Sequence, residues 1–199
     1  MVDTQYEKDL IINNRELKYS GIFRADELFS TINRSLEQKG YTLREKKTEE
    51  SVMEAGKRTY VELRPYKEKS NYALLMIKIK ININNVTEKV DEVQGQKKKF
   101  QHGDVEIIFD SWLMTDYEGR WGMKPWMFFL KGIINKFVYT FPLAGGFQGE
   151  LVSDTAFIYA QIKKLLNSYG PEKMKPQSEQ EILKAVEEEM RKEAERGKE

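Results

Sequence analysis

The chain contains no cysteine and only one histidine among its 199 residues. Without cysteine, disulfides, thiolate metal sites and cysteine nucleophiles are excluded. A single imidazole, His102, leaves a zinc or copper centre without its usual nitrogen ligands, so we expect no metal and no cofactor. A Ser-His-Asp triad would need the same histidine, and no serine lies in the strained, glycine-flanked turn that presents such a nucleophile.

The sequence also lacks a strong net charge and a long uncharged run. Its net charge is +1, so no overall field attracts nucleic acid, which we do not expect as a partner. A membrane-spanning helix needs about 20 largely uncharged residues. The most apolar stretch, residues 121–147, is interrupted by Lys124, Lys131 and Lys136. The first residues lack a secretion-signal pattern, which favours a cytoplasmic protein with at most peripheral membrane contact.

Hydrophobic spacing divides the chain into three parts. Residues 1–14 form a polar lead-in, residues 15–170 a single domain, and residues 171–199 a linker with a charged C-terminal helix. The domain opens with a strand over residues 15–23, where apolar and polar side chains alternate. A helix over residues 24–40 follows, ending at a glycine placed to cap it.

The clearest strand runs over residues 72–86. Its isoleucines alternate with polar side chains, which predicts one buried face and one face exposed to water. This pattern is typical of an antiparallel sheet that is covered on one side. The predicted buried set is Ile77, Ile79, Ile81 and Ile83, and the predicted exposed set is Lys78, Lys80, Asn82 and Asn84.

A second long strand is predicted over residues 104–117, after a strand over 96–101 and a hairpin turn at residues 102–104. One of its faces is apolar, and carboxylates interleave with Trp112 on the other. We favour ion pairs between these carboxylates and Lys78 and Lys80. Acid–base catalysis by a carboxylate with a raised pKa is the alternative. The apolar set is Val105, Ile107, Phe109 and Leu113, and the carboxylates are Glu106, Asp110 and Asp116.

The aromatic stretch predicts a helix over residues 125–141 with one wide apolar face. We expect Phe129, Ile133 and Phe137 to face the sheet or a cavity. The helix is interpreted either as core or pocket wall, or as an interfacial helix with aromatics on one side and lysines on the other. The candidate ligand- or surface-binding residues are Trp112, Trp121, Trp126, Met127, Phe128 and Lys131.

Two segments flank the predicted closing helix over residues 150–170. Residues 144–149, Ala-Gly-Gly-Phe-Gln-Gly, are interpreted as a tight turn, because the lysine and hydroxyl residue of a phosphate-binding loop do not follow. The C-terminal helix begins with a capping box, Ser178 with Glu181. Its apolar residues are few, so we expect it to dock only lightly.

Together these elements predict an α+β fold: a curved antiparallel sheet of about six strands with helices packed on one face, plus the charged C-terminal helix. The order of elements from Arg15 to Tyr169 resembles the START-related helix-grip superfamily of polyketide cyclases and lipid-transfer domains. That resemblance implies a hydrophobic cavity between the sheet and the closing helix. The extra helix over residues 125–141 departs from the family pattern.

No motif identifies a reaction, so we expect a module without catalytic activity. The leading hypothesis is binding of an apolar or lipid-like small molecule, or of a membrane surface, through the aromatic segment 121–141. The alternative is a protein-interaction or assembly module that uses the same segment together with the charged C-terminal helix. A cyclase- or hydrolase-type enzyme acting in an apolar pocket is the third hypothesis.

Overall fold

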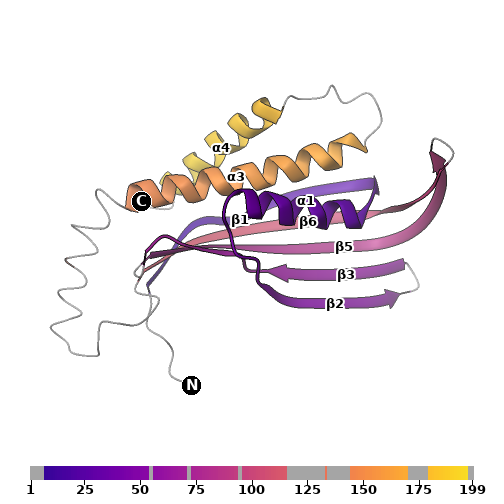
Figure 1. Cartoon of the computed structure of the whole chain (residues 1–199), viewed down its shortest axis with the longest axis horizontal. Coiled ribbons are helices and arrows are strands. Elements are labelled where there is room, and N and C mark those ends of the chain that lie inside the picture. The colour runs from indigo at the N-terminus through magenta and orange to yellow at the C-terminus, as the bar shows by residue number, and fades with distance from the viewer. Residues whose placement is uncertain are drawn as a thin grey trace, which may run out of the picture.

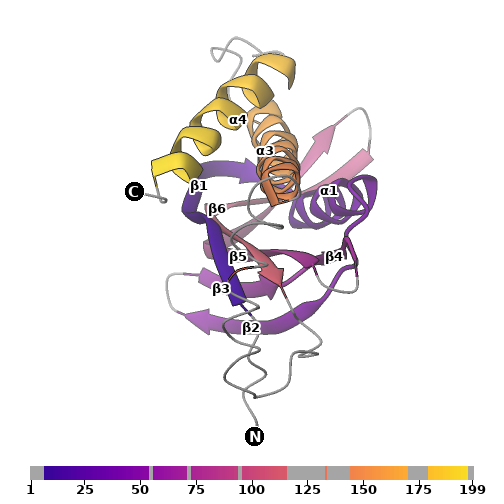
Figure 2. The same ribbon diagram turned by 90° about the vertical axis from the view of Figure 1, so that its left-hand side faces the viewer.

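The computed structural model describes residues 7–53, 56–70, 73–93, 96–115, 133, 144–169 and 179–196. Over these residues the chain forms a curved, unclosed antiparallel sheet and helices that cover one of its faces (Figures 1 and 2). This arrangement confirms the predicted α+β fold class. Helices α1 and α3 lie over the sheet, and α4 packs on α3.

The elements follow one another as a strand, a helix, five strands and two helices in the described part of the chain. They are β1 (Glu7–Phe23), α1 (Ala25–Gln38), β2 (Glu45–Met53), β3 (Gly56–Leu63), β4 (Tyr66–Glu68), β5 (Ala73–Val93), β6 (Gln96–Thr115), α3 (Ala144–Ser168) and α4 (Glu179–Arg196). The strand order is β1-β6-β5-β3-β2, and β4 pairs with β5. The first strand therefore lies beside the last one, and β1 and β2 form the two edges.

The covered face of the sheet is aliphatic. The isoleucines of β5 are 0 to 3% exposed, as their alternation predicts. In the register Ile79, Ile81 and Ile83 lie opposite apolar residues of β6, and Ile77 lies opposite the buried Ser111. Helices α1 and α3 add their own apolar side chains to the same cluster. Complete burial of one such side chain stabilises the fold by about 1.5–3 kcal/mol. The central members of the cluster are Ile77, Ile79, Ile81, Ile107, Phe109, Leu28, Ile32, Leu36, Leu151, Ile158 and Ile162.

The first strand begins at Glu7, so the prediction that residues 1–14 are a lead-in is wrong for residues 7–14. Ile12 is fully buried within β1. The register with β6 shifts between Ile12 and Arg15, where Asn14 has a φ of 53°. This bulge breaks the alternation of apolar and polar residues, and the sequence pattern is therefore regular only from Arg15 onward.

The predicted hairpin turn at residues 102–104 is also wrong, because β6 runs through it without interruption. His102 pairs with Ile22 of β1 and with Thr87 of β5, and its side chain is exposed. The β5–β6 register shifts between Asn84 and Thr87. A Cβ on Gly103 would lie 2.7 Å from the carbonyl oxygen of Asn84. The glycine therefore permits close backbone approach at a bulge rather than a turn.

Residues 144–149 form the first turns of α3, not the predicted tight turn. Glycine disfavours helix by about 1 kcal/mol per residue relative to alanine. Tertiary contacts oppose this tendency: Phe147 packs against the core, Gln148 donates a hydrogen bond to Asp9, and Glu150 pairs with lysines from β4 and from the residue after it. Local propensity is therefore overridden by packing.

The C-terminal helix docks firmly, so the prediction of a lightly docked tail and a domain boundary at residue 170 is wrong. Ile182, Val186 and Met190 recur at every fourth position of α4 and are 0 to 4% exposed. They belong to the same hydrophobic cluster as the sheet. Arg15 of β1 also forms an ion pair with Glu189. Helix α4 thus completes the layer that begins with α3.

Candidate functional site

The face of the sheet away from the helices is polar at its centre. Asp110 is 7% exposed and lies 3.4 Å from Lys80 and 3.8 Å from Lys78. It also accepts a hydrogen bond of 2.9 Å from the backbone N–H of Asn14. The predicted ion pairing is confirmed for Asp110, but the two lysines are half-buried rather than exposed. Glu106 pairs instead with Lys18, at 3.3 Å.

Trp112 lies on this open face, next to the charged centre. The Lys78 ammonium is 5.8 Å from the centre of the Trp112 ring. Burial, and then the positive charge of Lys80, lowers the pKa of Lys78 below its ordinary value. Of the six candidate binding residues, Trp112 is the one that lies within the described part of the chain.

The other candidate binding residues, Trp121, Trp126, Met127, Phe128 and Lys131, lie outside the described residues. The same holds for Asp116, Phe129 and Phe137 and for most of the predicted helix over 125–141. Ile133, the single described position of this helix, is 40% exposed. This exposure disagrees with its predicted place against the sheet.

An apolar patch surrounds Trp112 at the end of the open face. In the register, Trp112 lies opposite Leu10 of β1 and Met76 of β5. One step further along β6, Met114 lies opposite Leu74. Directly opposite residues of neighbouring strands share a face of the sheet, so the five side chains are contiguous. Four of them are at least partly exposed to solvent.

A hollow of about 460 Å³ opens over part of this patch. Its apolar wall is formed by Leu74, Met76 and Met114. Its polar lining, which we call the basic rim, consists of Lys8, Arg44, Lys46, Arg64, Tyr66 and Glu68. Sites for small molecules usually span about 300–1,000 Å³ and combine apolar walls with a few polar groups. This hollow, which we call the basic hollow, has a volume in that range and combines an apolar wall with polar groups.

The basic rim keeps an excess of positive charge. Arg64 is held by Glu62, with hydrogen-bond and ion-pair distances of 2.7 and 2.6 Å. Arg44 and Lys46 form no ion pair with any residue that the structure describes. Among the described residues of the lining, Glu68 is the single carboxylate. An anionic group entering the hollow would therefore meet two exposed cations that form no ion pair with a described carboxylate.

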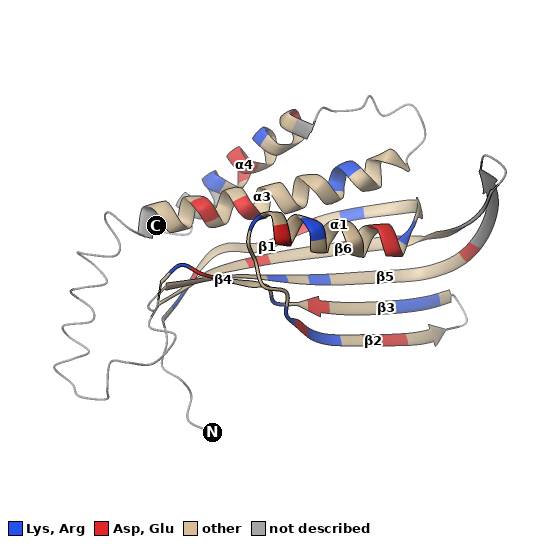
Figure 3. Cartoon of the chain, viewed as in Figure 1, with Lys and Arg blue, Asp and Glu red and all other residues tan. Residues whose placement is uncertain are grey.

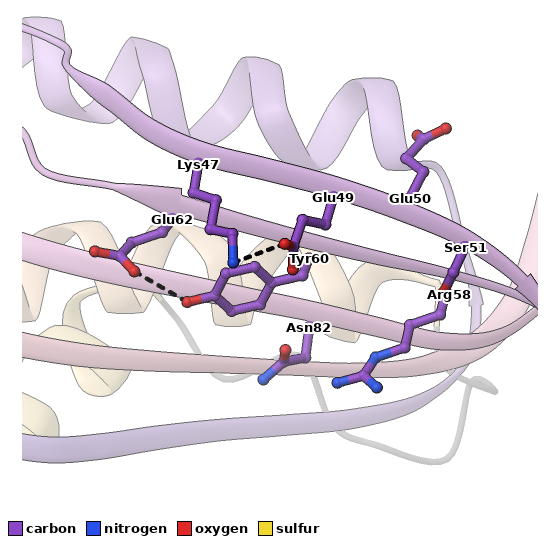
Figure 4. A pocket seen from close by; sticks show the side chains of 8 residues that line it. All are labelled: Lys47, Glu49, Glu50, Ser51, Arg58, Tyr60, Glu62 and Asn82. Atoms are coloured by element: carbon purple, nitrogen blue, oxygen red, sulfur yellow. Dashed lines mark hydrogen bonds and ion pairs between the residues drawn. The ribbon is translucent and has the colours of Figure 1, made fainter.

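A second hollow on the open face, of about 630 Å³, has the opposite character (Figure 4). Lys47 pairs with Glu49 at 2.6 Å, and the Tyr60 hydroxyl donates to Glu62 at 3.0 Å. Three carboxylates face two cations in this paired groove, which therefore offers no surplus positive charge. The groove is lined by Lys47, Glu49, Glu50, Ser51, Arg58, Tyr60, Glu62 and Asn82.

A cluster of charges on the helix side ties α3 to the sheet. Lys67 of β4 lies 3.2 Å from Asp154 and 2.6 Å from Glu150, and Lys39 lies 3.3 Å from Asp154. Burial alone would lower the pKa of Lys67, but the two carboxylates raise it above its ordinary value. Burial, with Asp154 nearby, likewise raises the pKa of Tyr41. Local sequence signals did not reveal this cluster, because its members are far apart along the chain.

The chain matches no family model, no curated protein and no solved structure. Among the described residues, histidine, aspartate and glutamate side chains do not form a group of three or more that could hold a metal ion. Over that same part of the chain, no helix has the length and apolar character needed to cross a membrane.

Proposed function

We propose that this chain is a non-catalytic module that binds an apolar, lipid-like ligand or a membrane surface. The observation that carries the proposal is the basic hollow, where an apolar wall meets exposed cations with no carboxylate partner among the described residues. This combination of an apolar wall and exposed cations suits an anionic amphiphile. The apolar tail of the ligand would lie on Met76 and Met114, and its headgroup would meet Arg44 and Lys46.

Trp112 extends this site beyond the hollow. It lies beside Met76 in the register, so an apolar chain that leaves the hollow would meet its ring. The aromatic segment 121–141, with Trp121, Trp126, Met127, Phe128 and Lys131, follows the end of β6 in the sequence. Its composition supports the same proposal, because aromatics and lysines together are typical of interfacial segments.

The proposal keeps the resemblance to the START-related superfamily as one of its supports, through element order alone. A strand and helix precede the antiparallel strands, and α3 lies over the sheet (Figure 1). The basic hollow lies on the opposite face from α3, so it is a different place from the cavity that the resemblance implies. We also propose a cytoplasmic location with peripheral membrane contact, since the chain is cysteine-free.

The assembly-module alternative has weaker support where it relies on the C-terminal helix. The apolar residues Ile182, Val186 and Met190 of α4 are buried against the core of the same chain and are not available to a partner. A partner would therefore meet mainly the charged side of that helix, where individual exposed ion pairs contribute about 0–1 kcal/mol.

Binding of a fluorescent fatty-acid analogue tests the proposal directly. Reversing both exposed cations of the rim, in Arg44→Glu/Lys46→Glu, should weaken binding about ten-fold or more, because two charge-assisted contacts become repulsive. An uncharged analogue with the same chain should bind the wild type and this variant equally. Arg58→Glu in the paired groove is the matched control and should bind the anionic analogue like the wild type.

The apolar half of the site needs a separate variant. Met76→Lys should weaken binding of the anionic and uncharged analogues alike, because it places an ammonium group in the apolar wall. Circular dichroism verifies that each variant stays folded. Equal binding of both analogues by the wild type and all three variants would exclude the basic hollow as the binding site.

A further inference from the structure

The two edges of the sheet differ in how they are protected. The β1 edge is contacted by α4, and Arg15 of β1 pairs with Glu189 of that helix. The β2 edge has no described element beyond it (Figure 1). Every residue from Glu45 to Val52 is exposed, and Val52 is 86% exposed. An uncovered edge strand presents free backbone N–H and C=O groups that can pair with another strand.

The charges on β2 are arranged symmetrically about Thr48. Lysines occupy the two positions before it and glutamates the two positions after it, in the order Lys46-Lys47-Thr48-Glu49-Glu50. Figure 3 shows positive and negative positions along this edge strand. An antiparallel pair of two such strands, centred on Thr48, would place Lys47 of each copy opposite Glu49 of the other, while Lys46 lies in the bulge that precedes the paired segment. A strand with this pattern is self-complementary.

We propose that β2 pairs with β2 of a second copy of this chain, with Thr48 on the two-fold axis. The sheets of the two copies then join into one continuous antiparallel sheet. On the open face, Lys47 of each copy lies opposite Glu49 of the other. The interface is isologous, as expected for a two-fold dimer. This inference does not rest on the proposed ligand-binding function.

Other registers are disfavoured by the same charges. A shift by two positions in one direction places Glu49 opposite Glu49, and in the other direction it places Lys47 opposite Lys47. Like charges at directly opposite positions are destabilising. A shift by a single residue would turn the side chains of one copy to the opposite face of the joined sheet. The register centred on Thr48 is therefore the one that the charge pattern selects.

The competing occupant is a strand from a different protein. Such a partner would need a strand whose charges are complementary to those of β2. A second copy of this chain already has that strand, because β2 is self-complementary. The bulge between Glu45 and Lys47 marks one end of the pairing segment and limits its extension. The proposed contact is thus short and centred on Thr48.

Cysteine cross-linking tests the register, since the chain has no cysteine of its own. Thr48→Cys should give a disulfide-linked dimer on mild oxidation, because a residue on the axis lies opposite its own copy within reach of a disulfide. Ser51→Cys is the matched control: it lies beyond the paired segment and away from its own copy, so it should stay largely monomeric. A mixture of Lys47→Cys and Glu49→Cys chains should cross-link, because these two positions lie opposite each other in the register centred on Thr48.

Charge reversal tests the interaction without a covalent bond. In sedimentation equilibrium, Lys47→Glu and Glu49→Lys should each weaken the wild-type dimer about ten-fold, because two attractive pairs become two like-charge pairs. The double variant Lys47→Glu/Glu49→Lys should restore it, and each variant should keep the wild-type circular dichroism spectrum. A wild type that sediments as a monomer, or equal cross-linking of Thr48→Cys and Ser51→Cys, would overturn the proposal.

Discussion

The two faces of the sheet are built from the same strands but differ in composition and burial. On the covered face, the odd-numbered positions from Ala73 to Ile83 of β5 and from Val105 to Leu113 of β6 are apolar, apart from Ser111, and are buried beneath α1 and α3. On the open face, the even-numbered positions combine ion pairs, a tryptophan and two hollows. Alternation along a strand separates stability from recognition: substitutions on one face should unfold the chain, and those on the other should change what it binds.

Removing residues 171–199 should have the largest effect on stability. The loss of α4 exposes the surface that Ile182, Val186 and Met190 cover, and we expect the free energy of unfolding to fall by about 3–6 kcal/mol. Thermal unfolding followed by circular dichroism measures this loss. Lys192→Ala is the control, since its exposed ion pair with Glu188 should contribute less than about 0.5 kcal/mol. An unchanged melting temperature after truncation would show that α4 does not belong to the covered layer.

Neighbouring residues of β5 provide the sharpest test of the contrast between the faces. Ile79→Ala should reduce stability by about 2–5 kcal/mol, because Ile79 is fully buried in the cluster. Lys80→Ala should reduce it by less than about 1 kcal/mol, since its half-buried ammonium group loses one ion pair to Asp110. Urea denaturation of both variants gives the comparison. Similar values for the two substitutions would contradict the separation of the faces.

Replacing two glycines with alanine should change stability in opposite directions. At Gly103 a neighbouring backbone atom lies too close for a Cβ, whereas at Gly146 helix propensity favours alanine. Gly103→Ala should be destabilising by about 1–3 kcal/mol, because its Cβ would meet the Asn84 carbonyl oxygen at 2.7 Å. Gly146→Ala in α3 meets no atom within 4 Å and should stabilise the chain by about 0.4–1 kcal/mol. Opposite signs in thermal denaturation are the expected result. A stabilising Gly103→Ala would mean that the bulge relaxes at no cost.

The smallest expected effect is a pH dependence on the open face. Burial would raise the pKa of Glu62, but hydrogen bonds from Arg64 and Tyr60 hold it below the ordinary 4.5. A carboxylate with a lowered pKa stabilises the fold above its unfolded-state pKa, and that contribution is lost as the pH falls through the folded-state pKa. Between about pH 5 and about pH 3, the wild type should therefore lose more stability than Glu62→Gln. Identical pH profiles would contradict this role.

The fold class was predictable because the long strands and the first helix carry strong periodic patterns. Ile77, Ile79 and Ile81 are buried as their alternation indicates, and Gly40 has the positive φ, 75°, expected of a helix cap. The errors have a common cause. At Asn14 a bulge disrupts the period, and at Gly103 the glycine of a bulge has the sequence signature of a turn.

The candidate site was less predictable than the fold. Trp112 was identified from its place among carboxylates, but Arg44 and Lys46 were not, since isolated cations in a charged segment give no signal. They become significant only because the pairing of β4 with β5 and of β5 with β6 brings Met76 and Met114 into the same hollow. Proximity of this kind depends on long-range pairing, which a sequence pattern does not report. The docking of α4 was missed for the same reason.

The pairing of β1 with β6 has a consequence for how the chain reaches its native state. Glu7 pairs with Thr115, and α4, near the opposite end of the chain, packs on the layer that includes β1. Contacts so distant in sequence require the closure of large loops, which slows folding to about the millisecond-to-second range seen for domains dominated by non-local pairing. During synthesis, the apolar side of β1 would stay exposed until β6 and α4 emerge from the ribosome. This segment is therefore where we expect a chaperone to bind the nascent chain.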